Sequence, residues 1–442
     1  MSQQYHFPIR SGARHVMAGE CVHIFRRRFA LRTTTHLVRR SACAAALALL
    51  ATGVASAPAL AAGTRPATLA PRDGAGGDLF GESAATSSNG AVTAVGSPEH
   101  NSAGAVYVFT RTGTTFSQTA ELTPSNPQAD EQFGMSVAMS GNGRTLVATA
   151  PGAAGAGVSD QGAAYVFTDR AGSWTQIAEL TVPGTMELGT SVAISANGST
   201  IVVGSAFSNN DNGEAFVYTK SGSTYRQAQK LTAKKPKPGP TPPPPAFFGF
   251  TTALSSSGST IAFGEPNVGV TDVFTKPAGA SAWTQTAQLP GGGDSVAVSG
   301  NGTIVAAGQA GINNLNGAVF VFTKSGGTFT KASTVLPPKN TTIAAFAAGT
   351  NIGMSADGSL IAFGAPTANA GAVGEAGAVF VATKTHGTWA LTGTDTEPHP
   401  ASGDDLGGGD GSVAVAGNGS AIVAGARAAH GQTGQAVIFP VS

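Results

Sequence analysis

The sequence predicts an all-β fold, a seven-bladed propeller of four-stranded antiparallel blades. Three observations support this. A short glycine turn recurs seven times, the segments around it keep the same order, and the two chain ends supply complementary parts of one repeat. The composition agrees, because 61 glycines and a charged fraction of only 11% argue against helices linked by Glu–Lys pairs.

The recurring turn joins the first two strands of each repeat. Successive turns lie 53, 55, 60, 44, 56 and 61 residues apart, and alternating apolar segments such as 136–140 and 145–151 flank them. Asn-Gly between such segments predicts a type I′ hairpin, in which both central residues have positive φ. The turns are Asn89-Gly90, Asn142-Gly143, Asn197-Gly198, Ser257-Gly258, Asn301-Gly302, Asp357-Gly358 and Asn418-Gly419.

Two further strands complete each repeat, and four antiparallel strands form one propeller blade. The blades are predicted to begin near residues 78, 131, 187, 247, 292, 348 and 408. The third strands are predicted at Ala105–Thr110, Ala163–Thr168, Ala215–Thr219, Asp272–Thr275, Ala318–Thr323, Ala378–Thr383 and Ala436–Pro440. Most fourth strands open on an aromatic residue: Phe116, Trp174, Tyr225, Trp283, Phe329 and Trp389.

The two ends of the chain are predicted to meet in the seventh blade. The last repeat stops after its third strand, and residues 67–71 resemble residues 120–124, which end a fourth strand. The N-terminal segment is therefore expected to supply the outer strand of the last blade and to close the ring by strand pairing.

Short motifs in the repeats resemble the FG-GAP repeats of integrin-α-type propellers. The pairs Phe80-Gly81, Phe133-Gly134 and Phe248-Gly249 are followed by Gly-x-Pro at 96–98, 264–266 and 364–366. In the other repeats the opening pair becomes Leu188-Gly189, Gly292-Gly293, Ala348-Gly349 and Gly409-Asp410. The resemblance covers residues 64–442. It implies a propeller used for adhesion or ligand binding, often with calcium in the turn between the first two strands.

The turns lack the carboxylates with which the family holds calcium. Ca²⁺ takes six to eight oxygen ligands, several of them carboxylates. Here the turns read Ser-Gly-Asn-Gly or a close variant, and Asp357 is the one acid they retain. We therefore predict no metal and no cofactor, and a thermal midpoint that EDTA leaves unchanged.

Residues 1–61 are predicted to be a signal peptide with a long basic n-region. Arginines between residues 26 and 40 precede the apolar run 42–57, and Ala59-Leu60-Ala61 supplies a cleavage site. We expect a secreted protein, extracellular or periplasmic, whose mature chain has no integral membrane segment. Cys21 and Cys43 are the only cysteines and lie in this stretch, so the mature chain has no thiol site.

The charge balance of the mature chain argues against a nucleic-acid partner. Residues 1–62 hold 8 of the 25 basic and 1 of the 24 acidic groups, so the remainder carries 17 − 23 = −6. A Pro/Lys-rich insert at 233–246 is predicted as a solvated polyproline II loop. A ligand for a proline-recognising groove, or a basic contact to an anionic surface, are the alternatives.

The outer-strand aromatics allow two interpretations. They could form a ring of sugar-stacking platforms, or they could fill the widening wedge between adjacent blades. We favour packing, because binding residues tend to differ between repeats whereas packing residues recur.

No catalytic constellation is found, since the histidines after residue 62 are isolated and no serine lies in G-x-S-x-G. We expect a monomeric, non-enzymatic binding or adhesion module whose partner is an extracellular protein or carbohydrate. The alternatives are a lectin that binds sugars between blades and, from another class, an enzyme acting on polysaccharides.

Binding residues are predicted on the loops opposite the Asn-Gly turns. These loops differ in length and sequence, and variable loops on a rigid scaffold often carry recognition, although sequence drift would look the same. The candidates are His100, Asn101, Asp130, Glu131, Asp160, Asn209, Asn210, Asp211, Asn212, Asn313, Asn314, Glu375, Asp404, Asp405 and His430.

Overall fold

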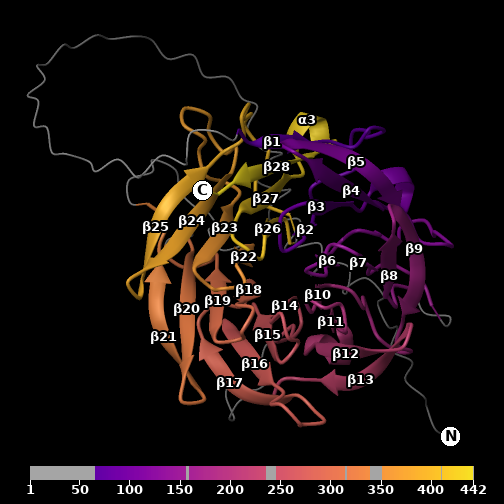
Figure 1. Ribbon diagram of the computed structural model, residues 1–442, viewed down its shortest axis with the longest axis vertical. Coiled ribbons are helices and arrows are strands. Elements are labelled where there is room, and N and C mark those ends of the chain that lie inside the picture. Colours follow the sequence, from indigo (N-terminus) through magenta and orange to yellow (C-terminus); the bar gives the residue numbers. More distant parts are fainter. Residues whose placement is uncertain are drawn as a thin grey trace, which may run out of the picture. The chain divides into compact units, whose positions relative to one another are not determined.

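A computed structural model describes residues 65–155, 159–234, 245–313, 316–338, 351–409 and 411–441. These residues form seven four-stranded antiparallel sheets in a ring (Figure 1), which confirms the predicted seven-bladed propeller. The predicted signal peptide, the start of blade six near residue 348 and most of the insert at 233–246 lie outside the described residues.

The strands follow one order in every blade, from the inner to the outer edge of the ring. Blade one contains β2 (Ala84–Thr86), β3 (Val92–Ser97), β4 (Ala105–Thr112) and β5 (Thr115–Leu122). Blade two contains β6 (Val137–Met139), β7 (Thr145–Ala150), β8 (Ala163–Arg170) and β9 (Ser173–Leu180). Blade three contains β10 (Val192–Ile194), β11 (Thr200–Ser205), β12 (Glu214–Ser221) and β13 (Thr224–Leu231).

Blades four to seven repeat this order. Blade four contains β14 (Thr251–Leu254), β15 (Thr260–Glu265), β16 (Val270–Thr275) and β17 (Thr284–Pro290). Blade five contains β18 (Ser295–Val298), β19 (Ile304–Gln309), β20 (Ala318–Ser325) and β21 (Thr328–Val335). Blade six contains β22 (Ile352–Met354), β23 (Leu360–Ala365), β24 (Ala378–Thr385) and β25 (Thr388–Asp395). Blade seven contains β26 (Val413–Val415), β27 (Ala421–Ala426), β28 (Gln435–Pro440) and the N-terminal β1 (Ala67–Leu69).

Three short helical turns lie between the second and third strands. They are η1 (His100–Ser102), α2 (Ser208–Asp211) and α3 (Ala429–Gln432).

Strand β1 is the fourth strand of blade seven, as the sequence predicts. It pairs antiparallel with β28, with Thr68 opposite Val437 and Leu69 opposite Ala436. The chain therefore closes the ring by pairing its N-terminal strand with its C-terminal one.

The predicted type I′ geometry of the Asn-Gly turns is wrong. In blade two, five residues (140–144) separate the strands, Gly143 has φ 71°, and Asn142 does not have a positive φ. The side chains close this longer turn instead, since Asn142 Oδ1 accepts from the Arg144 amide and Ser140 Oγ accepts from the Thr145 amide. Ser140 also donates to Asn142 Oδ1, so the Ser-x-Asn-Gly sequence specifies a self-bonded turn rather than a two-residue hairpin.

The FG-GAP glycines mark the places where neighbouring blades approach most closely. A Cβ on Gly96 in blade one would lie 2.0 Å from the carbonyl oxygen of Gly134, the glycine of the next blade's Phe-Gly pair. The preceding Phe133 is fully buried and its amide donates to Ala103. Only glycine allows two backbones to come this close, so each Phe-Gly pair packs tightly against the neighbouring blade.

In blade seven the opening pair is Leu406-Gly407, so the prediction of Gly409-Asp410 is wrong. Leu406 is fully buried and bridges Gly377 of blade six, and a Cβ on Gly364 would lie 2.2 Å from the Gly407 carbonyl oxygen. Leucine takes the phenylalanine position here, as Leu188 does in blade three, where it bridges Gly162.

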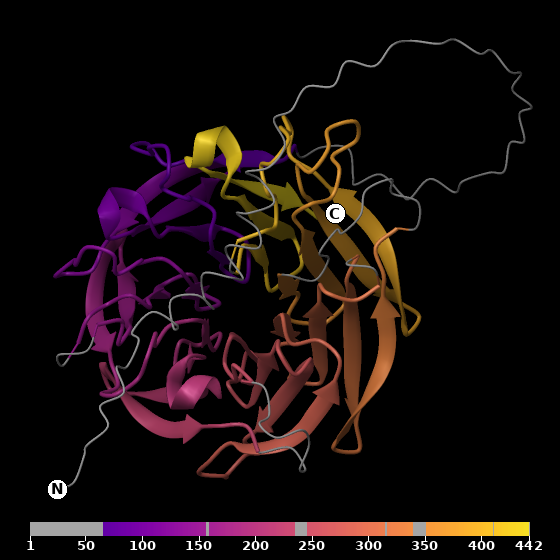
Figure 2. The same ribbon diagram turned by 180° about the vertical axis from the view of Figure 1, so that it is seen from behind.

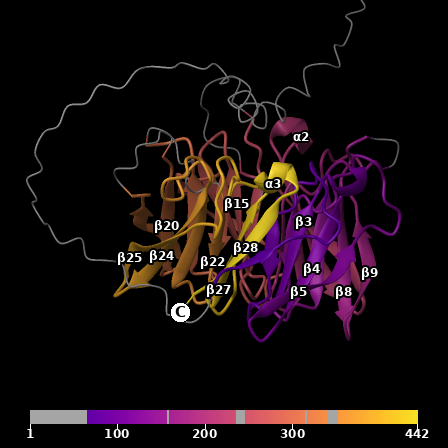
Figure 3. The ribbon, with the colours of Figure 1, turned by 90° about the horizontal axis from the view of Figure 1, so that it is seen from above.

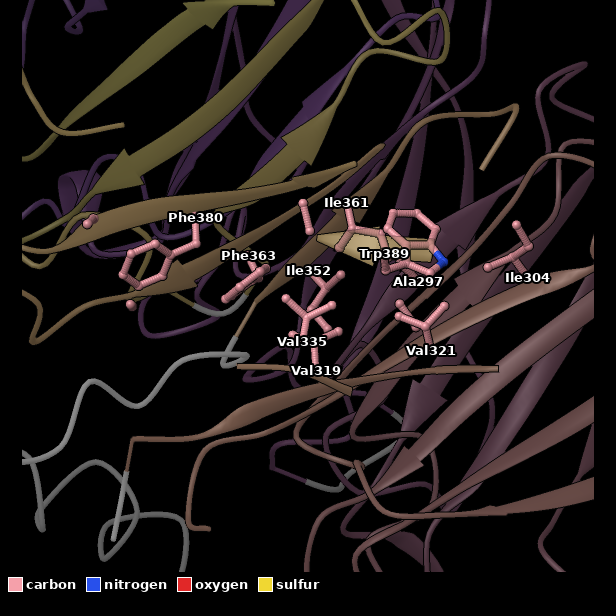
Figure 4. Packing of buried hydrophobic residues seen from close by; sticks show 14 of the residues in the cluster. Ala297, Ile304, Val319, Val321, Val335, Ile352, Ile361, Phe363, Phe380 and Trp389 are labelled. Atoms are coloured by element: carbon pink, nitrogen blue, oxygen red, sulfur yellow. The ribbon is translucent and has the colours of Figure 1, made fainter. Parts of the chain in front are cut away.

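The core lies between blades, and the outer-strand aromatics belong to it. Trp389 of blade six packs with Ile304 and Val321 of blade five (Figure 4). Trp283 is 3% exposed, and its Nε1 donates to the Gly258 carbonyl. This burial supports the packing interpretation, and the half-buried Phe116 and Trp174 also pack against these cores.

Candidate functional site

The variable loops gather at one end of the ring. Figure 3 shows α2 and α3 at this end, and both helices face the viewer in Figure 2. We call it the loop end; it comprises the loops between the second and third strands and those that lead to the next blade. The opposite, hairpin end carries the Asn-Gly turns and the hairpins between third and fourth strands.

Backbone hydrogen bonds bring loops of successive blades together in pairs. The Asp130 amide donates to the Ser102 carbonyl at 2.7 Å, beside Asn101. The Glu187 amide donates to Asp160 at 2.7 Å, and the Gly403 amide donates to Glu375 at 2.8 Å. The predicted residues thus form a chain of neighbouring loops around the ring instead of one converging site.

Most predicted binding residues have a left-handed backbone. Their φ angles lie between 50° and 67°, a region that Asn and Asp tolerate better than other residues with a Cβ. This gives them a conformational reason for their identity besides any role in binding. They are Asn101, Asp130, Asp160, Asn209, Asn210, Asp211, Asn313, Glu375, Asp405 and His430.

Three other candidates are buried and cannot meet a partner directly. His100 is 4%, Glu131 0% and Asp404 6% exposed. Burial raises the pKa of the Glu131 carboxyl. Asn314 lies outside the described residues.

His100 is the centre of a polar cluster at the junction of blades seven and one. Its Nδ1 lies 2.8 Å from Asp78 Oδ2, and the Asn101 amide group contacts its Nε2 at 2.8 Å. The Ala75 amide also donates to Asp78 Oδ2, at 2.7 Å. The loop following β1 and the loop following β3 are therefore joined through one imidazole.

Two more carboxylates face the other side of this imidazole. His100 Nε2 lies 3.7 Å from Asp73 Oδ2 and 3.9 Å from Glu121 Oε1. The Tyr107 hydroxyl donates to Asp73 Oδ1 at 3.0 Å. Partial burial, and next the negative charge of Asp73, raise the pKa of Glu121. Within the described ranges, Asp73, His100 and Glu121 form a group whose ligand atoms all lie within 4.8 Å, close enough to hold a metal ion.

A second charged cluster joins blades seven and one. Arg427 Nη1 contacts both Glu82 oxygens at 2.9 Å, and its Nε donates to Asp405 Oδ2 at 2.8 Å. Glu82 is 2% exposed. Burial raises the pKa of the Asp405 carboxyl, and Arg427 partly offsets this.

Blade four departs from the other blades by burying two acids. Asp272 lies opposite Phe263, at the position where blades one, two and three have Tyr107, Tyr165 and Phe216. Its Oδ1 accepts from Gln285 and Gln288. Burial, and then the adjoining Asp272, raise the pKa of Glu265 to about 9, so a proton is retained on this pair at neutral pH.

Exposed charge differs in sign between the two ends of the ring. Among the described residues, the exposed acids of the loop end are Asp73, Glu99, Glu121, Asp130, Asp160, Glu179 and Glu375. Its exposed bases are Arg72, Lys230 and Lys234. Arg72 and Lys234 donate to main-chain oxygens of neighbouring outer strands, and Lys230 pairs with Glu214. The hairpin end exposes Arg65, Arg111, Arg144, Arg170, Lys220 and Arg226, against the acid Asp357. The loop end is therefore acidic and the hairpin end basic.

Sequence reasoning identified His100 and Asn101 but missed the residues around them, namely Asp73, Asp78, Tyr107 and Glu121. One signal was available. An acid occurs two residues before the Phe-Gly or Leu-Gly pair at Asp78, Glu131 and Asp404, and all three are buried. A buried carboxylate that recurs at the same position of several repeats indicates that it makes a fixed polar contact.

The ring of seven sheets defines the protein as a β-propeller, a fold that supports a binding-type module. Residues 64–109 and 116–167 match the FG-GAP repeat. Together with the seven-bladed ring, this match supports the resemblance to integrin-α-like FG-GAP-repeat propellers. No curated protein matches the sequence.

Solved structures with a similar fold have low sequence identity to this chain. A candidate 6-phosphogluconolactonase from Bacteroides uniformis has a TM-score of 0.51 and 16% identity, over 74% of this chain and 86% of that one. Hydrazine synthase from Kuenenia stuttgartiensis has a TM-score of 0.54 and 12% identity, over 84% and 97%. Both likenesses concern the fold alone. No helix in the described part of the chain is long and apolar enough to cross a membrane.

Proposed function

We propose that the protein is an exported, non-enzymatic binding module that captures a cationic extracellular protein on its loop end. The observation behind this proposal is the opposite sign of exposed charge at the two ends of the ring. A field of one sign over a variable surface favours partners of the other sign and accelerates their encounter.

Export is part of the proposal. FG-GAP repeats are typical of extracellular proteins, and the predicted signal peptide at 1–61 agrees with this. The −6 net charge of the remaining chain suits a soluble module that meets basic surfaces.

A protein partner fits the loop end better than a sugar does. Carbohydrate sites commonly present exposed aromatic faces, whereas no aromatic residue in the described part of the chain is fully exposed. The exposed large hydrophobic residues among the described ones are Val268 and Leu336. Recognition at this end would therefore depend on charge and hydrogen bonds.

A binding screen tests the proposal. The purified protein is applied to an extracellular-matrix protein array and a glycan array at low and high salt. We expect basic proteins to bind, and binding to weaken as salt screens the acidic end. Salt-insensitive binding to glycans alone would support the lectin alternative, and polysaccharide hydrolysis would support an enzyme; either result contradicts the proposal.

Variants in the loops test which end of the ring binds the partner. The triple variant Asn209→Gly, Asn210→Gly, Asp211→Gly removes three side chains from α2. Glycine is chosen because it readily adopts the positive φ angles of these positions, 57°, 54° and 62°. It should weaken binding, whereas Asn142→Gly at the hairpin end should not. The reverse pattern in folded variants would show that the hairpin end binds the partner.

A further inference from the structure

We propose that Asp73, His100 and Glu121 bind one divalent transition-metal ion, and that Zn²⁺ fits these donors best. The site lies away from the Asn-Gly turns, where the family's calcium would be held. It revises the expectation from the sequence that the chain has no metal.

The distances suit a small cation. Donor atoms around a tetrahedral Zn²⁺ at about 2.0–2.1 Å from the metal lie about 3.3 Å apart. His100 Nε2 is already 3.7 Å from Asp73 Oδ2 and 3.9 Å from Glu121 Oε1. The side chains of Asp73 and Glu121 are 48% and 35% exposed, so small rotations can close the remaining gap.

The surrounding contacts are those of a prepared metal site. A metal-binding histidine usually donates its other ring N–H to a carboxylate, which fixes the tautomer and the ring. His100 is 4% exposed, and its Nδ1 lies 2.8 Å from Asp78 Oδ2, which leaves Nε2 as the lone-pair nitrogen on the side of Asp73 and Glu121. Tyr107 orients Asp73 in the same way, through a hydroxyl hydrogen bond of 3.0 Å.

Asn101 occupies the position that the ion would take beside His100. Its amide group lies 2.8 Å from Nε2, and its side chain is exposed. Binding therefore requires the Asn101 amide to rotate away, with no rearrangement of buried groups.

The donor set selects the class of metal. One imidazole nitrogen and two carboxylates suit Zn²⁺ and related transition metals, whereas Ca²⁺ needs six to eight oxygens. Three protein ligands leave a fourth position for water or a partner's side chain.

Blade two is a natural control for this assignment. Tyr165 and Glu179 pair across β8 and β9 as Tyr107 and Glu121 pair across β4 and β5. However, Ala153 is the third residue after β7, where His100 is the third residue after β3. Blade two therefore keeps the flanking residues and lacks the central ligand.

A metal ion at this site would link two parts of the propeller. Asp73 lies four residues after β1, the strand that completes blade seven, and His100 and Glu121 belong to blade one. A bound ion would connect the closing segment to blade one. Zn²⁺ should therefore raise the melting temperature.

The test is metal binding by the full-length protein, stripped with EDTA and dialysed. Co²⁺ is followed by its visible absorption and Zn²⁺ by calorimetry. We expect the double variant Asp73→Asn, Glu121→Gln to lose at least about 100-fold in affinity, and Tyr107→Phe to lose about 10-fold, as removal of an outer-shell partner typically does. Glu179→Gln and Tyr165→Phe should bind as the wild type does.

The outcomes separate the possibilities. Wild-type protein that binds neither Co²⁺ nor Zn²⁺ would overturn the proposal, as would a folded double variant with unchanged affinity. Should the double variant fail to fold, Tyr107→Phe decides, because other blades carry phenylalanine at this position. An unchanged affinity and Co²⁺ spectrum in that variant would count against the site.

Discussion

Leu69 pairs with Ala436 in the antiparallel ladder that joins the first described strand to the last. The leucine is 2% exposed, while its neighbour Thr68 is exposed. Without β1, strand β28 would present an open edge to solvent, and open edges promote aggregation. The closure of the ring therefore depends on one three-residue strand.

Weakening this strand should weaken the whole propeller. Leu69→Ala removes a buried side chain and should lower the free energy of unfolding by about 2–4 kcal/mol. Deletion of residues 64–71 should cost more and should cause aggregation. Thr68→Ala is the control and should change stability by less than about 0.5 kcal/mol. Denaturant and thermal melting provide the measurement, and an unchanged curve after the deletion would reject closure by β1.

The contact between Gly96 and Gly134 predicts a large effect of a single methyl group. Gly96→Ala places a Cβ about where the Gly134 carbonyl oxygen stands, at 2.0 Å, and should destabilise by about 3 kcal/mol or more. Gly113→Ala should cost only about 1 kcal/mol, because that glycine has φ 63° but no atom within 4 Å of the new Cβ. Equal losses in the two variants would contradict the close contact between Gly96 and the next blade.

The buried acids of blade four predict that stability falls as the pH rises. Burial, with Asp272 beside it, raises the pKa of Glu265 from 4.5 to about 9, so the folded state keeps a proton that the unfolded chain releases. Stability is therefore fully present below pH 4.5 and declines toward pH 9, with a slope of up to about 1.4 kcal/mol per pH unit for one proton. Glu265→Gln cannot ionise and should flatten this decline.

Urea unfolding across this pH range measures the slope. Burial also raises the pKa of Glu397 to about 8 and that of Glu187 to about 7, so part of the decline should persist in Glu265→Gln. Glu99→Gln, at an exposed position, should leave the wild-type slope unchanged. A Glu265→Gln variant that declines as steeply as the wild type would show that Glu265 is ionised in the folded protein.

The self-bonded turns predict that calcium is irrelevant at the hairpin end. Asp357 Oδ1 accepts from Ser355 and from the Ser359 amide, just as Asn142 does from Ser140 and Arg144. Asp357→Asn should therefore change stability by less than about 0.5 kcal/mol at neutral pH. These hydrogen bonds hold the pKa of Asp357 low, so the wild type alone should lose their contribution in acid. A melting temperature that rises with Ca²⁺ in the wild type and not in Asp357→Asn would contradict this account.

The architecture could be predicted because each blade repeats one local pattern. Alternating apolar segments, glycine turns and the shared fragment at 67–71 fix strand order and closure without knowledge of distant contacts. The turn geometry could not be predicted from Asn-Gly alone, because the side chains of Ser140 and Asn142 determine the conformation.

The polar clusters could not be predicted, because they join segments that are distant in the sequence. Asp73 and Glu121 meet only after β1 has crossed to blade seven, and Arg427 reaches Glu82 across the closure. Asp272 occupies a strand position that other blades fill with an aromatic residue. The repeat pattern therefore predicts that residue 272 lies in a strand, but it does not predict that its carboxyl is buried beside Glu265.

The most direct test of the acidic loop end compares two charge-neutralised variants. One variant carries Asp130→Asn, Asp160→Asn and Glu375→Gln at the loop end, and the other carries Arg111→Gln, Arg144→Gln and Arg170→Gln at the hairpin end. Each is measured for affinity to the strongest basic protein found in the array screen, at low salt. We predict that the loop-end variant binds at least about 10-fold more weakly, mainly through slower association, and that the hairpin-end variant binds as tightly as the wild type or more so. Unchanged binding by the loop-end variant, with loss in the hairpin-end variant, would contradict the account.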